Sequence, residues 1–149
     1  MPLLAVLAIC LATGMLLAMQ PAINAELARH LASGFAAALV SLTVSVVLAL
    51  PFAWRHLGGL RLETLGSAPG WVWLGGVAGA VFVTAGAFFV PRIGVAFFFS
   101  SIIAGQLVAA AVIDHFGFFG TAVRAFDAPR AIGIALVLAG VLVFRLARG

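Results

Sequence analysis

The sequence contains no lysine and no tyrosine, and only 8% of its 149 residues are charged. A soluble domain ordinarily has about a quarter of its residues charged, because it must present a polar face to water. Here 65% of the residues are hydrophobic, and they are gathered in long blocks. Such blocks are typical of helices surrounded by lipid, and they do not alternate as the strands of a membrane β-barrel do. The composition therefore predicts an all-α integral membrane protein.

Other absences exclude whole classes of function. The single cysteine, Cys10, allows no internal disulfide and no cysteine-based zinc site. A glycine-rich phosphate loop, a nucleophile elbow and a metal-ligand cluster are all missing. The positive charge comes from arginines scattered singly at segment ends, which is typical of membrane anchors and not of a phosphate-binding surface. We therefore expect no enzyme activity, no cofactor, no bound metal and no nucleic-acid partner.

Turn residues and charges divide the chain into five apolar segments within a single transmembrane domain, residues 1–149. Each of the first four contains 18 to 20 residues, which is close to the length needed to cross a bilayer of about 30 Å. The first segment lacks the basic stretch of a signal peptide, so we interpret it as a transmembrane helix. The expected helices cover about 3–20, 35–52, 71–90, 95–113 and 131–146.

The arginines give no preferred orientation in the membrane. With five crossings, the N-terminal side holds Arg55, Arg61, Arg124 and Arg130, and the opposite side holds Arg29, Arg92, Arg145 and Arg148. Because cytoplasmic loops normally carry an excess of positive charge, this balance allows two readings. Either one strongly placed charge decides the orientation, or the chain inserts both ways and pairs as an antiparallel homodimer. We favour the dimer, which would rebuild the inverted-repeat symmetry common in secondary transporters.

Three amides are the best candidates for a substrate site. Gln106 lies near the middle of the fourth segment, where an amide is costly unless it is paired. It would either join helices by hydrogen bonding or bind substrate. Gln20 and Asn24 lie four residues apart across Pro21, so they share a face if the helix continues past the proline. If the helix ends at Pro21 instead, both amides face water.

Other polar or small residues have weaker claims. Arg92 could hold an anionic group or anchor a lipid headgroup, and Ser101 could bind substrate or bond its own helix. Possible coupling or interfacial residues are Glu26, Asp114 and His115; the last two point about 100° apart on a helix, a poor geometry for a shared site. A small-residue face for close helix packing is formed by Gly75, Gly76 and Gly79.

Several short stretches together resemble one family. They are Gly14-x5-Gln20-Pro21-x2-Asn24-x2-Leu27, Gly75-Gly76-x2-Gly79-Ala80-x2-Val83, Pro91-Arg92-x-Gly94, Gly105-Gln106-Leu107 and Ile113-Asp114-His115-Phe116-Gly117. The chain resembles the small YdcZ-type inner-membrane proteins of the drug/metabolite transporter superfamily over nearly its whole length. The resemblance implies a five-helix half-transporter of a prokaryotic plasma membrane that works as an antiparallel dimer.

From the residues and the resemblance we expect a secondary transporter of a small polar or amphipathic metabolite. Gln20, Asn24 and Gln106 would line its central cavity. The alternatives are a non-transporting subunit of a larger complex and a channel for small solutes. The chain has no acidic residue in mid-membrane, which argues against the cation-export chemistry expected of the small multidrug exporters in that superfamily.

Overall fold

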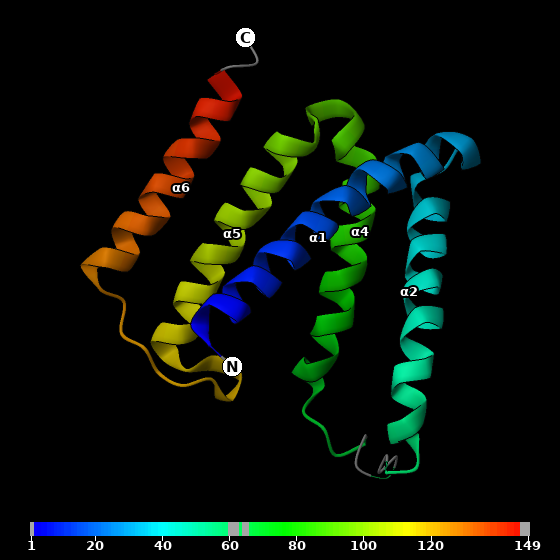
Figure 1. The fold of residues 1–149 in the computed structure, drawn as a ribbon, viewed down its shortest axis with the longest axis horizontal. Coiled ribbons are helices and arrows are strands. Elements are labelled where there is room, and N and C mark those ends of the chain that lie inside the picture. Colours follow the sequence, from blue (N-terminus) through cyan, green and yellow to red (C-terminus); the bar gives the residue numbers. More distant parts are fainter. Residues whose placement is uncertain (1, 60–62, 64–65, 147–149) are drawn as a thin grey trace. The chain divides into compact units, whose positions relative to one another are not determined.

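The computed structural model describes residues 2–59, 63 and 66–146. Its described part is helical, and five helices are long and apolar enough to cross a membrane. The predicted all-α membrane fold is therefore confirmed. In chain order the elements are α1 (Leu3–Leu31), α2 (Gly34–Leu57), the short η1 (Gly70–Trp73), α4 (Leu74–Ile93), α5 (Val95–Phe116), the short η2 (Phe118–Gly120) and α6 (Ala128–Leu146) (Figure 1).

The chain forms two compact units, Met1–Arg92 and Ile93–Gly149. The first contains α1, α2, η1 and α4, and the second contains α5, η2 and α6. The single transmembrane domain stays a prediction. Two of the arginines in the charge count, Arg61 and Arg148, lie outside the described residues.

Helix α1 does not end at Pro21, where the sequence suggested a break, but continues to Leu31. A proline removes one backbone hydrogen bond from a helix, yet transmembrane helices tolerate this loss when neighbouring elements pack around it. Pro21 is fully buried, so the helix is supported at the point where its hydrogen bonding is interrupted. The residue that follows the helix, Ala32, adopts a left-handed conformation with φ of 52°.

The other helices also extend beyond the expected spans. Ser33 caps the start of α2, where its Oγ accepts a hydrogen bond from the Ala36 N–H at 3.2 Å. Helix α4 passes through Pro91 and ends at Ile93. Helix α5 ends at Phe116 and is followed by Gly117, whose φ of 66° suits a residue without Cβ. At α6, the Asp127 carboxylate accepts from the Arg130 N–H at 3.1 Å and so caps the helix.

The core of the first unit is built mainly from small residues. These let helix backbones approach closely, which is the usual way transmembrane helices pack. On α1 the buried residues are Pro21, Asn24 and Ala25, on α2 they are Ala37 and Ala38, and on α4 they are Val83, Gly86, Ala87 and Val90. The α4 residues recur every three or four positions, so they form one face of that helix.

Two glycines of this unit mark contacts that leave no room for a side chain. A Cβ at Gly86 would lie 2.8 Å from the Pro21 Cβ, and α1 is seen to cross α4 in Figure 1. A Cβ at Gly34 would lie 2.8 Å from the Phe88 ring, which also packs edge-on against Phe35 at a centroid distance of 5.0 Å. Helix α4 therefore contacts both α1 and α2 through glycine.

Candidate functional site

The continuation of α1 through Pro21 places Gln20 and Asn24 on one face of the helix, about 40° apart. This settles the alternative left open by the sequence, in which the two amides lay beyond the end of the helix. Gln20 is half-buried, whereas Asn24 is only 3% exposed. The structure thus brings these two predicted residues together within the first unit.

Asn24 is buried without a full set of partners. Among the described residues, its Nδ2 finds no hydrogen-bond acceptor. Leaving a buried polar group unpaired costs about 1–3 kcal/mol, and native proteins seldom keep such a group without a reason. Asn24 lies three residues after Pro21, whose packing on Gly86 closes this part of α1 against α4.

Gln106 is exposed on α5. Because the side chain of Gln106 is exposed, helix α6 does not cover it within the second unit. Because Gln106 and Asn24 belong to different units, the cavity that they share with Gln20 stays a prediction.

Three other candidates bond within their own helices. The Arg92 guanidinium donates from Nη1 to the Phe88 carbonyl oxygen at 3.0 Å, and the Ser101 hydroxyl donates to the Phe97 carbonyl oxygen at 2.8 Å. Glu26 forms ion pairs with Arg29 and with His30, where the distance from Oε1 to Nε2 is 3.1 Å. All of these side chains are exposed. Because each is already bonded within its own helix, a role in substrate binding or coupling would require it to exchange partners.

The small-residue face at Gly75, Gly76 and Gly79 is exposed. A Cβ added at any of the three would meet nothing within 4 Å. Within the first unit these glycines therefore pack against no described helix. Their packing role stays a prediction.

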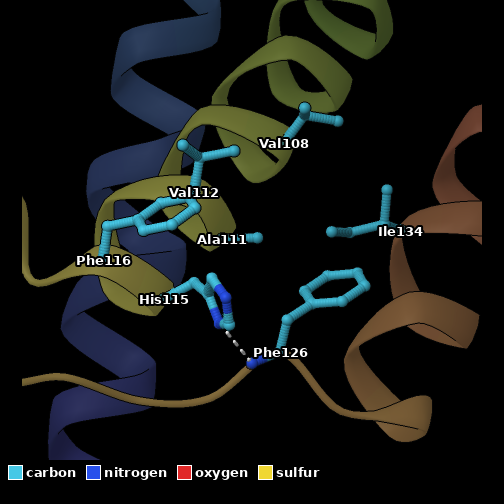
Figure 2. A pocket seen from close by; sticks show the side chains of 7 residues that line it. All are labelled: Val108, Ala111, Val112, His115, Phe116, Phe126 and Ile134. Carbon is cyan, nitrogen blue, oxygen red and sulfur yellow. Dashed lines mark hydrogen bonds between the residues drawn. The ribbon is translucent and has the colours of Figure 1, made fainter.

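Asp114 and His115 lie in the last turn of α5, where the chain turns toward α6. The Asp114 carbonyl oxygen accepts from the Arg124 N–H at 2.7 Å, and His115 Nδ1 accepts from the Phe126 N–H at 3.1 Å. Figure 2 shows His115 and Phe126 side by side at the edge of a hollow of about 440 Å³. The other residues that line this hollow are Val108, Ala111, Val112, Phe116 and Ile134.

Comparison with known proteins identifies the family. A family model described as "Putative inner membrane exporter, YdcZ" matches residues 5–143. The chain belongs to the YdcZ family. Searches of curated proteins and of solved structures find no match. The resemblance read from the sequence is thus confirmed, and with five membrane-crossing helices the chain is a multi-pass protein of the inner membrane, as predicted.

The YdcZ family is one of membrane exporters and not of enzymes. Sequence reasoning did not find the contact of Gly86 with Pro21 or the attachment of residues 121–127 to the end of α5. A signal for the first was present, because Gly86 falls on the same helical face as Val83 and Val90. The second depends on hydrogen bonds to backbone groups, for which the sequence has no pattern.

Proposed function

We propose that the protein is a secondary transporter that moves a small polar or amphipathic metabolite across the inner membrane. It works by alternating access in an antiparallel homodimer. Membership of an exporter family supports the general activity. The observation that carries the proposal is Asn24, an amide buried in a transmembrane helix three residues after a proline, with its Nδ2 unpaired among the described residues.

An unpaired amide is useful to a transporter because a substrate can satisfy it. Transporter binding sites commonly lie at interrupted helices, where polar groups become available inside the membrane. When α1 moves away from Gly86, the Asn24 amide gains access to a polar substrate. When α1 returns, the site closes. Substrate binding would then offset the cost of burying the amide in the empty protein.

Gln106 supplies the second amide of the proposed pathway. It lies near the middle of a membrane span and is exposed within its own unit, although an amide in lipid is costly. A second protomer would cover it and place it at a cavity between the two copies. Ser101 and Arg92 would reach the substrate by giving up the bonds within their helices.

The first test is the substitution Gln106→Leu. We expect it to reduce transport at least tenfold while expression and dimer formation stay unchanged, because a hydrogen bond to substrate is lost within a low-dielectric site. Liposomes containing the purified protein would be loaded with amino acids, nucleosides and organic acids, and the released compounds would be measured by mass spectrometry. Val108→Leu, about 200° away around α5, is the matched control. Normal release by Gln106→Leu would disprove the assignment.

The same liposomes separate the alternative functions. A carrier exchanges labelled substrate against unlabelled substrate on the other side, whereas a channel shows no such counterflow. A subunit that needs a larger partner gives no release at all when it is reconstituted alone. Counterflow by the purified chain is the result that we expect.

Dual insertion is a separate prediction. In a Cys10→Ser background, a Gly66→Cys variant would be labelled in intact cells with a membrane-impermeant thiol reagent, before and after permeabilisation. The arginine balance predicts that about half of the cysteines react before permeabilisation. Adding Gly58→Arg should shift the population, because the side with extra positive charge becomes cytoplasmic. If, without the added arginine, either all or none of the cysteines react before permeabilisation, the chain has one fixed orientation.

A further inference from the structure

The connection between α5 and α6, residues 121–127, has no regular secondary structure, yet hydrogen bonds hold it to both helices. At its α5 end, the Asp114 carbonyl oxygen accepts from the Arg124 N–H at 2.7 Å. At its α6 end, Arg130 Nη1 donates to the Arg124 carbonyl oxygen at 3.0 Å. Between them, the Phe126 N–H donates to His115 Nδ1 at 3.1 Å.

The bond to His115 differs from the other two because its acceptor can gain a proton. A neutral imidazole has one nitrogen that accepts and one that donates, whereas both nitrogens of the protonated ring are donors. The Phe126 N–H can therefore bond to Nδ1 only while His115 is neutral and carries its hydrogen on Nε2. Once Nδ1 is protonated, two N–H groups face each other and the bond is lost.

We propose that His115 is a proton-controlled tether: neutral His115 holds Phe126 of the α5–α6 connection against α5, and protonated His115 releases it. Histidine is the side chain that ordinarily gains its proton between pH 8 and pH 5. The tether is therefore present while the imidazole is neutral and is lost once Nδ1 gains a proton.

The charges around the tether come from all three neighbouring segments. Asp114 lies beside His115 on α5, Arg124 and Asp127 lie on the connection, and Arg130 begins α6. The Asp127 carboxylate is engaged with α6, where its Oδ1 accepts from the Arg130 N–H and lies 3.9 Å from Arg130 Nε. Neither of the other two hydrogen bonds uses the imidazole, so the proton dependence resides in the bond to Phe126.

Release of Phe126 would open the hollow beside α5. Phe126 lines this hollow next to Ile134 and across from Val112, as Figure 2 shows. The backbone of Phe126 is the group that His115 holds. Protonation would therefore free Phe126 to leave and would open the hollow, whose volume is about 440 Å³, at the end of α5.

The tether can be tested without a transport assay, so its failure would not bear on the proposed function. A nitroxide spin label would be attached at Ala125→Cys in a Cys10→Ser background, in the full chain in lipid nanodiscs. Spectra would be recorded between pH 8 and pH 5. We expect the ratio of mobile to immobile label to rise about fivefold, the change in equilibrium expected for the loss of one hydrogen bond. A label at Gly66→Cys, in the other unit, is the control for general effects of pH.

Two substitutions make the result specific to His115. In His115→Asn the amide oxygen takes nearly the position of Nδ1 but gains no proton in this range, so the label should stay immobile at both pH values. In His115→Leu the acceptor is missing, and the label should be mobile at both. The proposal is overturned if the label in the unsubstituted chain does not respond to pH, or if His115→Asn responds equally. The same ratio of mobile to immobile label at Gly66→Cys in all variants would show that the variants are folded.

Discussion

Replacing Gly86 by leucine should destabilise the protein by about 1–3 kcal/mol, the usual cost of forcing extra atoms into a packed core. Even a Cβ at this position would lie 2.8 Å from the Pro21 Cβ. The neighbouring atom belongs to a rigid ring in a fully buried residue, so it cannot rotate away as a flexible side chain would. Helix α1 would have to separate from α4. Thermal unfolding of the purified protein in detergent measures the loss.

The control for this experiment is Gly14→Leu, because Gly14 also lies in a transmembrane helix but has nothing within 4 Å of an added Cβ. We expect that variant to unfold close to the unsubstituted protein. Equal stability of the two leucine variants would show that α1 and α4 are not in contact at Pro21. The separation of α1 from α4 should also expose Asn24, so Gly86→Leu tests the closed state of the proposed transporter.

Replacing Asn24 by leucine should have opposite effects on stability and on transport. The substitution removes an amide that is 3% exposed and whose Nδ2 is unpaired among the described residues. Removing the desolvation cost should stabilise the protein by about 1–3 kcal/mol. Transport should fall at least tenfold, because the substrate loses its hydrogen-bond partner on α1. Thermal unfolding and release from loaded liposomes measure the two effects.

The neighbouring Ile23 gives a matched control for Asn24. It is 58% exposed, so Ile23→Leu should change neither stability nor transport. A less stable Asn24→Leu variant would mean that the amide has a partner in the folded protein. Unchanged transport would remove Asn24 from the pathway. Higher stability with lost transport is a combination that a merely structural residue would not show, because proteins often sacrifice stability at functional sites.

The sequence was sufficient to predict the five membrane-crossing helices, because long apolar blocks are a strong signal and lipid requires them to be helical. It was less informative about their ends. Pro21 suggested a break, since proline disfavours a helix interior, but burial against Gly86 supports α1 through it. Packing between segments far apart in the sequence decided this point, and local patterns do not record such packing.

The candidate site, too, was predictable from the sequence only in part. That Asn24 and Gln20 share a face followed from their spacing once the helix was known to continue. That Asn24 is buried, whereas Arg92 and Ser101 bond within their own helices, depended on which face of each helix is covered. His115 was predicted only as a possible coupling or interfacial residue. Its bond to Phe126 joins residues 11 apart through a connection without regular structure, and neither helical nor strand periodicity predicts such a contact.

The length of α1 also ties the site to the thickness of the bilayer. Its 29 residues extend about 43 Å along the helix axis, whereas the hydrocarbon core is about 30 Å thick. A helix that starts crossing at Leu3 with a tilt of about 20° leaves the hydrocarbon near Ile23, just before Asn24. A thinner bilayer, or a helix closer to the membrane normal, would move Asn24 into the headgroup region. A thicker bilayer would draw it into the hydrocarbon core. Lipid chain length should therefore control how readily the buried amide meets water.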